Sequence, residues 1–354
     1  MKFDIQEATL LSKWFIKNGR KLPWRNTHDA YDVWLSEIML QQTRIEAVIP
    51  KYLAFKETLP TIQDLANCNE EQLLRLWEGL GYYNRARNLK KCASILVEKY
   101  DCHLPKTKKE LLSLPGIGEY TSGAILSIAY GIGEPAIDGN VLRVFARYTL
   151  DNRNVLEKPI QVDVYQMIAS IFQQNDSKQF IQAFTQGIME LGEVVCLPNG
   201  QPKCNLCPLQ YSCLAHKDHQ EITYPTRIKK NEKKVIYKTI CIIHTEEKFL
   251  FHKREDKGLL ANLYEFYNED KHYSKEEIED RLKKVGWKVK SITPLPPTKH
   301  IFTHLIWDMI GYDIQVSSTT SPLGKEYQFY SREEIKSLAL PSAFSKYVRL
   351  FKLR

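Results

Sequence analysis

The sequence predicts a multidomain protein in which an all-α domain is followed by an α+β domain. The chain has 354 residues, more than one typical hydrophobic core supports. Up to about residue 216, apolar residues recur at helical spacing, whereas the pattern after a basic stretch favours strands. Hydrophobic residues make up 43% and charged residues 26%, which excludes a largely disordered chain.

The charge distribution suggests where the domains meet. Residues 1–225 carry 25 basic and 25 acidic residues, so the whole formal net charge of +8 lies in the rest of the chain. Residues 227–238 alone carry six basic residues and one acidic residue. We therefore expect a first domain at 1–216, a basic linker at 217–238 and a second domain at 239–354. A net positive charge permits nucleic-acid binding.

The first domain is expected to contain at least seven helices. We expect one helix capped by Asn69 and others at residues 32–42, 85–100, 119–130, 139–150, 162–173 and 177–191, with Gly or Pro between them. The second domain has β-rich segments at 235–244, 249–252, 288–292, 305–315 and 327–330, and helical segments at 274–285 and 332–337.

The sequence gives no sign of a membrane segment. No apolar run reaches the roughly 18 residues of a membrane helix, and residues 1–20 lack the apolar core of a signal peptide. We expect a cytoplasmic protein if the source is bacterial, and nuclear or mitochondrial locations stay open otherwise. In such compartments the eight cysteines are expected to be free or metal-bound.

Four cysteines close the first domain within eighteen residues. They are Cys196, Cys204, Cys207 and Cys213, with the spacing C-x7-C-x2-C-x5-C. Four thiolates in a proline-rich loop suit a tetrahedral metal ion or an iron–sulfur cluster. The spacing leaves zinc and iron–sulfur both open.

A glycine hairpin lies between two expected helices. Gly116 and Gly118 in the segment LPGIG allow a tight turn with exposed amides, which suits a phosphate group. Twenty positions after Gly118, Asp138 stands at the start of a helix, where a carboxylate is favoured. Taken alone, the hairpin fits a structural corner and Asp138 fits an N-cap.

Together these features resemble the helix–hairpin–helix DNA glycosylases. The segments LPWR (22–25), WLSEIMLQQT (34–43), WEGLGYYNRAR (77–87) and MELG (189–192) are similar to the adenine-specific branch of that superfamily. Tyr120 follows the hairpin where the bifunctional endonuclease III branch has a nucleophilic Lys. The resemblance therefore implies a monofunctional adenine glycosylase without efficient strand cleavage.

The second domain resembles the Nudix-like lesion-recognition domain of the same branch. The segment GLLANLYEF (258–266) carries this resemblance, and the carboxylate-rich metal motif of active Nudix hydrolases is absent from the sequence. We expect binding and not hydrolysis. Phe302, Thr303 and His304 resemble the family loop that recognises 8-oxoguanine.

The resemblance also implies roles for individual residues. Glu37 lies in an apolar run, which would raise its pKa and let it protonate adenine as general acid; a solvated helix glutamate is the alternative. Asp138 would stabilise the oxocarbenium-like sugar and form a transient adduct, with Tyr120 and Asn140 hydrogen-bonding around the two carboxylates.

Further residues are assigned to the adenine pocket and to DNA contacts. The pocket is expected to contain Trp24, Arg25, Leu40 and Glu190, and the DNA and lesion contacts to include Gln42, Thr43, Leu80, Tyr82, Arg85 and Arg87 besides the hairpin and the 302–304 loop. Ordinary aromatic core is the alternative for Trp24 and Tyr82, and a solvated helix face for the basic run at 85–91.

The sequence thus predicts a monomeric DNA repair enzyme, nucleoid-associated in a bacterium, that flips out adenine paired with 8-oxoguanine or guanine and hydrolyses its glycosidic bond. One 4Fe-4S cluster is expected on the four cysteines. A bifunctional pyrimidine-lesion glycosylase is disfavoured by Tyr120 and by the second domain. A noncatalytic iron–sulfur DNA-binding module is disfavoured because Glu37 and Asp138 are both present.

Overall fold

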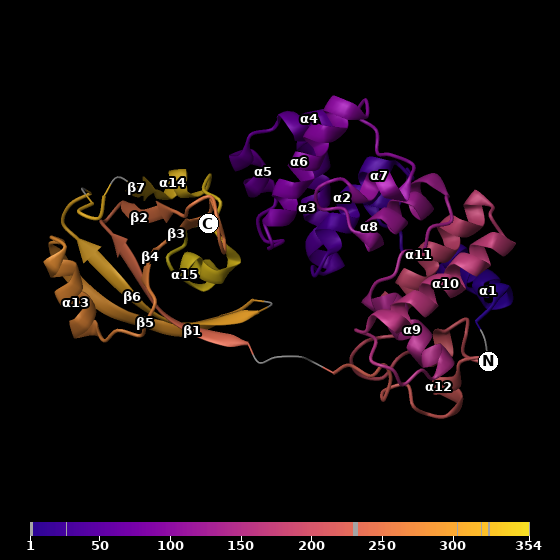
Figure 1. Cartoon of the computed structure of the whole chain (residues 1–354). Coiled ribbons are helices and arrows are strands. Elements are labelled where there is room, and N and C mark those ends of the chain that lie inside the picture. Colours follow the sequence, from indigo (N-terminus) through magenta and orange to yellow (C-terminus); the bar gives the residue numbers. More distant parts are fainter. Residues whose placement is uncertain are drawn as a thin grey trace. The chain divides into compact units, whose positions relative to one another are not determined.

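The computed structural model describes residues 3–25, 27–228, 233–302, 304–319, 321–324 and 326–353. The chain divides into two compact units (Figure 1), one formed by Met1–Cys68 with Asn84–Lys229 and the other by Asn69–Tyr83 with Lys230–Arg354. The first unit is helical and the second is built on a sheet, which confirms the predicted fold class. The grouping of Asn69–Tyr83 with the second unit was not predicted.

The first unit contains eleven α-helices among its described residues. They are α1 (Ile5–Asn18), α2 (Ala30–Leu40), α3 (Ile45–Thr58), α4 (Ile62–Asn67), α6 (Asn84–Lys99), α7 (Lys108–Leu112), α8 (Glu119–Ala124), α9 (Gly139–Thr149), α10 (Lys158–Gln174), α11 (Lys178–Val194) and α12 (Leu214–Lys217). Short 3-10 turns form at η1 (Pro23–Arg25) and η3 (Cys204–Leu206), and η2 (Ile125–Tyr130) is π-helical. None of the described helices has the length and apolar character needed to cross a membrane.

Helix α1 was not predicted from hydrophobic spacing, although its start has a local cause. Asp4 accepts a hydrogen bond from the backbone N–H of Gln6 at 2.8 Å, and Glu7 binds back to the N–H of Asp4. This reciprocal cap satisfies donors that a helix start leaves unpaired. The helix then packs on α11, and Leu11, Phe145 and Phe184 share the core of this unit.

A close backbone approach links α8 to the segment that precedes α9. A Cβ atom added to Gly123 would lie only 2.4 Å from the carbonyl oxygen of Pro135, so only glycine fits. The buried hydroxyl of Ser127 donates to the carbonyl oxygens of Ile132 at 3.1 Å and Glu134 at 2.6 Å. These contacts set where α8 stands relative to Asp138 at the start of α9.

The second unit is a seven-stranded mixed sheet covered by helices. Its strands are β1 (Lys234–His244), β2 (Lys248–Lys253), β3 (Tyr264–Glu265), β4 (Tyr267–Glu269), β5 (Val289–Ile301), β6 (Leu305–Val316) and β7 (Tyr327–Ser331). Its helices are α5 (Glu70–Leu76), α13 (Lys275–Lys284), α14 (Arg332–Ile335) and α15 (Ser345–Leu350), with a 3-10 turn η4 (Ser342–Phe344).

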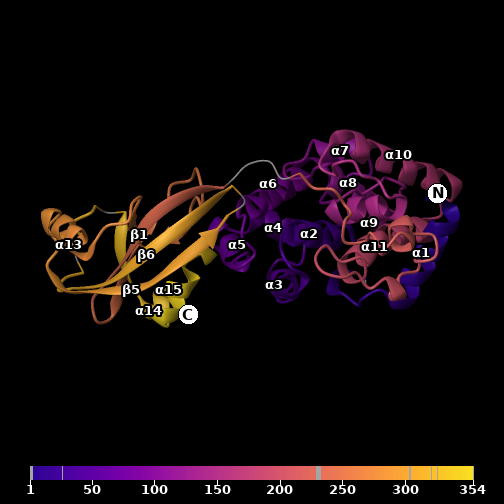
Figure 2. The ribbon, with the colours of Figure 1, turned by 90° about the horizontal axis from the view of Figure 1, so that it is seen from below.

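The sheet order is β3-β2-β1-β6-β5, with β4 pairing β1 and β7 pairing β2. Strand β1 runs parallel to β6, and the three long strands β1, β6 and β5 lie side by side (Figure 2). One core forms around Trp307 and Phe344, and a second around Trp287 and Ile278 of α13.

Strand β5 is much longer than the predicted segment at 288–292. Pro294, Pro296 and Pro297 argue against a strand in the sequence, because proline cannot donate to a ladder. The strand lies at the edge of the sheet, where proline is tolerated, and its register shifts between Leu295 and Thr298. It ends with Ile301 opposite Ile306, so Phe302 and His304 lie in the connection between β5 and β6.

Candidate active site

A cavity of about 640 Å³ in the first unit is lined by residues of η1, α2, α8, α9 and α11. It brings together ten residues that sequence reasoning assigned to catalysis, the adenine pocket or DNA contact: Trp24, Arg25, Glu37, Leu40, Gln42, Thr43, Tyr120, Asp138, Asn140 and Glu190. They come from segments far apart in the chain, so the fold gathers them at one site.

Glu37 lies on α2 with 8% of its surface exposed, so it is not a solvated helix glutamate. The hydroxyl of Tyr120 donates to its Oε2 atom at 2.6 Å. Burial raises the pKa of Glu37 to about 7; the negative charge of Asp138 adds to this rise, while the Tyr120 hydrogen bond and Arg25 oppose it. The sequence-based expectation of a raised pKa is confirmed, and the side chain is poised to exchange a proton near neutral pH.

Asp138 is the N-cap of α9 and also lines the cavity, so the structural and functional interpretations both hold. Its Oδ1 accepts from the backbone N–H groups of Asn140 at 2.9 Å and Val141 at 2.8 Å, and its Oδ2 accepts from the Asn140 amide at 2.8 Å. Burial raises the pKa of Asp138, and these hydrogen bonds and the charge of Arg143 oppose the rise.

Asn140 is held from three sides. Besides Asp138, its amide nitrogen donates to Glu193 at 3.2 Å, while its Oδ1 accepts from Arg143 at 2.8 Å. The same guanidinium donates to the carbonyl oxygens of Gly192 at 2.7 Å and Cys196 at 2.9 Å. One network therefore joins the start of α9 to the end of α11 and the cysteine loop.

The far wall of the cavity carries a buried ion-pair cluster around Glu190. Arg20 donates to both carboxylate oxygens, at 2.6 and 3.0 Å, and Arg25 donates to Oε2 at 2.9 Å. Burial acts to raise the pKa of Glu190, but the hydrogen bonds and charges of the two arginines outweigh it and lower the pKa. Glu190 is thus a fixed anion that orients two guanidinium groups.

Arg20 and Gln186 are among the cavity residues that sequence reasoning missed. Arg20 has no motif signal, because its partner Glu190 is 170 residues away. Gln186 lies on α11 one turn before Glu190, and this spacing of four on one helix face could have identified it.

Arg85 has a structural role that the sequence did not indicate. Its Nη1 atom donates to the carbonyl oxygens of Ile38, Met39 and Gln41, at 2.6, 3.0 and 2.7 Å, and its Nη2 donates to the Thr43 hydroxyl at 3.2 Å. These are carbonyls that the end of α2 leaves unpaired. The contact of Arg85 with DNA stays a prediction.

The other expected DNA contacts occupy different places. Gly116 has φ of 81°, and a Cβ there would lie 2.9 Å from Cβ of Asn88; Gly118 is the N-cap of α8. Arg87 donates to the side chain of Asn84 at 3.1 Å. In the turn after α5, Leu80 is buried and Tyr82 is exposed with φ of 49°.

The four cysteines surround a small pocket between α9, α11 and the 196–213 loop. Arg147 donates to the Cys196 sulfur at 3.3 Å. Burial raises the pKa values of the Cys204 and Cys207 thiols to about 12. A bound metal centre would offset this penalty by stabilising the thiolates.

Among the described residues, one group of three possible ligand atoms lies within 4.8 Å of one another, and its members are Cys204, His216 and Glu221.

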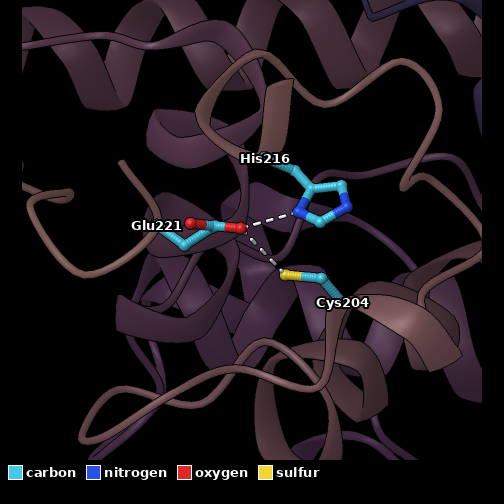
Figure 3. A group of neighbouring side chains, drawn as sticks. All are labelled: Cys204, His216 and Glu221. Atoms are coloured by element: carbon cyan, nitrogen blue, oxygen red, sulfur yellow. Dashed lines mark hydrogen bonds and ion pairs between the residues drawn. The ribbon is translucent and has the colours of Figure 1, made fainter. Parts of the chain in front are cut away.

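The group of Cys204, His216 and Glu221 is drawn in Figure 3. Glu221 Oε1 accepts from the His216 ring at 2.6 Å and from the Cys204 sulfur at 3.7 Å. Burial acts to raise the pKa of Glu221, but the His216 and Cys204 hydrogen bonds outweigh it and lower the pKa. The pair His216–Glu221 therefore holds Cys204 within the loop.

The expected lesion loop lies in the second unit. The Phe302 ring packs edge-on against the rings of Trp307 and His300, at 5.0 and 4.6 Å between centroids. His304 is exposed, and Thr303 lies outside the described residues. The carbonyl oxygen of Phe302 accepts from Lys233 at 2.8 Å, which braces the loop against the start of β1.

Two domain families match the chain. Residues 35–191 match the model described as HhH-GPD superfamily base excision DNA repair protein, and residues 239–350 match the NUDIX domain. The adenine DNA glycosylase of Buchnera aphidicola subsp. Schizaphis graminum is 34% identical over 98% of both chains. The adenine DNA glycosylase of Mus musculus is 30% identical over 98% of this chain and 79% of its own.

Solved structures match the helical unit. A thermostable thymine-DNA glycosylase has a TM-score of 0.52 at 25% identity, covering 60% of this chain and 95% of that one. An endonuclease III in a non-covalent DNA complex has a TM-score of 0.50 at 23% identity, covering 62% and 99%. At 23% identity, the likeness to endonuclease III shows the fold alone.

The buried Glu37 carboxyl should make stability depend on pH. Because its pKa is raised to about 7 in the folded protein, its stabilising contribution is present at low pH and is lost as pH rises from about 4.5 through 7. The variant Glu37→Gln lacks this loss. Its free energy of unfolding relative to wild type should rise by about 2 kcal/mol from about pH 5.5 to about pH 8, measured by urea denaturation. The exposed Glu46→Gln serves as control, and parallel pH profiles would contradict the raised pKa.

Proposed function

The chain belongs to the adenine DNA glycosylases of the HhH-GPD superfamily, and we propose that it excises adenine paired with 8-oxoguanine or guanine by acid-assisted hydrolysis of the glycosidic bond. The observation that carries this mechanism is a cavity holding two carboxylates, Glu37 and Asp138, in different environments. Base-excision repair begins with this release of a base.

Glu37 is the proposed general acid. A carboxyl with a pKa of about 7 keeps a proton near neutral pH, and it can deliver that proton to a ring nitrogen of the flipped adenine. Protonation makes adenine a better leaving group. Tyr120, which donates to Oε2, fixes the orientation of the carboxyl group.

Asp138 is the proposed partner of the positively charged sugar. Burial raises the pKa of Asp138, and its hydrogen bonds at the start of α9 oppose that rise by favouring the carboxylate form. As the bond to adenine breaks, this carboxylate stabilises the oxocarbenium-like sugar and forms a transient adduct that water resolves. Tyr120 cannot serve as the amine nucleophile of a lyase, which supports a monofunctional enzyme.

The cavity offers partners for the flipped base. Trp24 and Leu40 supply apolar surface, and the Arg25–Glu190 pair supplies polar contacts. Gln42 and Tyr82, both with left-handed φ values, are proposed to contact the opposing strand. The 302–304 loop of the second unit, with Phe302 and His304, is proposed to recognise 8-oxoguanine. We propose that the protein acts as a monomer on double-stranded DNA.

We propose one 4Fe-4S cluster on Cys196, Cys204, Cys207 and Cys213. The four cysteines line one small pocket, and Arg147 places a positive charge beside the Cys196 sulfur, which suits an anionic thiolate cluster. The cluster would fix the loop that follows α11. This chain's own residues carry out the excision.

Changing Glu37 to Gln should abolish adenine release, because the amide has no acidic proton to give. Single-turnover assays on duplexes with adenine opposite 8-oxoguanine, guanine or thymine should show wild-type excision only from the two mispairs. Glu37→Gln should lose at least ~100-fold in rate while retaining mispair affinity in gel-shift assays, and Glu46→Gln should be unaffected. Normal turnover by Glu37→Gln would remove the general-acid role. Strand breaks before alkali treatment would indicate lyase activity.

Substituting His304 by Ala should reduce the preference for 8-oxoguanine over guanine opposite adenine. The expected loss is about 1–2 kcal/mol of discrimination, or roughly tenfold, measured as the ratio of excision rates. His272→Ala in the same unit is the control. An unchanged ratio in His304→Ala would exclude this loop from lesion recognition.

The purified protein should be brown and contain iron and acid-labile sulfide. Metal analysis of anaerobically prepared protein should find about four irons per chain, as a 4Fe-4S cluster requires. Cys207→Ser should lower the iron content, and Cys92→Ser, which changes a cysteine outside the loop, should not. Zinc in place of iron would overturn the cluster assignment.

A further inference from the structure

The residues just before the basic stretch 227–238 are fixed to the first unit, which carries the proposed active site and is called the catalytic unit below. Arg147 on α9 donates to the carbonyl oxygen of Tyr224 at 2.8 Å, and the backbone N–H of Val155 donates to the carbonyl oxygen of Thr226 at 3.2 Å. These two hydrogen bonds lie on either side of Pro225. They determine where the next residue, Arg227, leaves the surface.

Arg227 lies against the first residue of the helix that carries Asp138 as its cap. A Cβ atom added to Gly139 would be 3.3 Å from the Nη2 atom of Arg227. Gly139 and Asp138 both line the cavity. The guanidinium group therefore stands beside the cavity wall, one residue from the carboxylate that faces the sugar.

This guanidinium has no internal partner among the residues that the structure describes. The neighbouring Arg143 and Arg147 are buried and donate to carbonyl oxygens, whereas Arg227 is exposed and forms no ion pair or hydrogen bond there. Burial lowers the pKa of Arg143, and the charges of Arg147 and Arg227 contribute further. Arg227 is thus close to this network but free to bind an external anion.

Asp138 and Glu193 lie on this side of the cavity, where the Asn140 amide donates to both. Neither carboxylate forms an ion pair among the described residues, because Arg20 and Arg25 pair with Glu190 instead. A nucleotide that enters brings two flanking phosphates to the rim, where Asp138 and Glu193 would repel them. A nearby guanidinium offsets this repulsion and binds a phosphate with fixed geometry.

We propose that Arg227 binds a phosphate that flanks the flipped deoxyadenosine and thereby positions the sugar over Asp138. This inference rests on the proposed function, because it takes Asp138 as the group that meets the sugar. It assigns Arg227, the first residue of the basic stretch 227–238, to the reacting nucleotide itself, separately from general attraction to DNA. Arg227 is a positioning residue that acts through the substrate.

The test combines a protein variant with a chemical change in the DNA. Single-turnover adenine excision is measured for wild type and Arg227→Ala on duplexes with a neutral methylphosphonate immediately 5′ or immediately 3′ of the target deoxyadenosine. Arg227→Ala should lose about 10- to 100-fold on unmodified DNA, the value of a charge-assisted hydrogen bond. One of the two methylphosphonates should cause a similar loss in wild type and no additional loss in Arg227→Ala.

Controls separate this contact from charge in general. Arg153→Ala removes an exposed arginine that already pairs with Asp151 and Asp163, and it should match wild type on every duplex. Arg227→Lys should recover part of the rate. In binding assays, the slope of log K against log salt concentration should fall by about one for Arg227→Ala.

The outcomes decide the proposal. The proposal is overturned if both methylphosphonates cause a further loss of rate in Arg227→Ala. It is also overturned if the salt slope of Arg227→Ala equals that of wild type. If wild type excises adenine and Arg227→Ala excises it at the same rate, the contact is refuted and the proposed function is not. Absence of adenine excision by wild type would instead refute the proposed function, while the salt slope would still report on phosphate binding.

Discussion

Two buried arginines on α9 are the constraint on which the catalytic unit depends. Arg143 and Arg147 lie one turn apart, 2% and 3% exposed, without carboxylate partners within hydrogen-bonding distance among the described residues. A buried cation must be satisfied by hydrogen bonds, and these two reach carbonyl oxygens of the α11 end, the cysteine loop and the linker start. One helix thus binds together the segment that carries Asp138, the cysteine loop and the path toward the second unit.

The cavity beside this frame holds two carboxyl groups, Glu37 and Asp138, in different environments. Glu37 is buried on α2 and accepts a hydrogen bond from the Tyr120 hydroxyl, and burial is the largest cause of its raised pKa. Asp138 receives backbone donors at a helix start, which support the charged form. Two carboxyl groups held in different environments can divide the roles of acid and anion. The Tyr120 side chain defines the environment of Glu37, and two backbone N–H groups together with the Asn140 side chain define that of Asp138.

The parts that could be predicted from the sequence are those with local causes. The apolar neighbours of Glu37 indicated its burial, the glycines indicated the hairpin, and the clustering of four cysteines indicated a metal loop. Contacts across long sequence separations left no such signal: Arg20 meets Glu190 only after α11 packs beside η1, and Arg85 reaches the end of α2 only in the folded unit. The full length of β5 was not predicted because its prolines have low strand propensity. Propensity does not take into account that proline is tolerated in a strand at the edge of a sheet.

The hydrogen bond at Thr226 also limits the length of the connection between the catalytic unit and β1. Thr226 is hydrogen-bonded to the catalytic unit and β1 begins at Lys234, so seven residues, 227–233, separate the last anchor from the sheet. Fully extended, such a tether spans at most about 28 Å. The chain also joins the two units at residues 68/69 and 83/84, so the sheet has a high local concentration at the catalytic unit, whatever the protein concentration in the cell. A module held on such a connection can have weak intrinsic affinity for its ligand and still be occupied whenever the unit to which it is joined is bound.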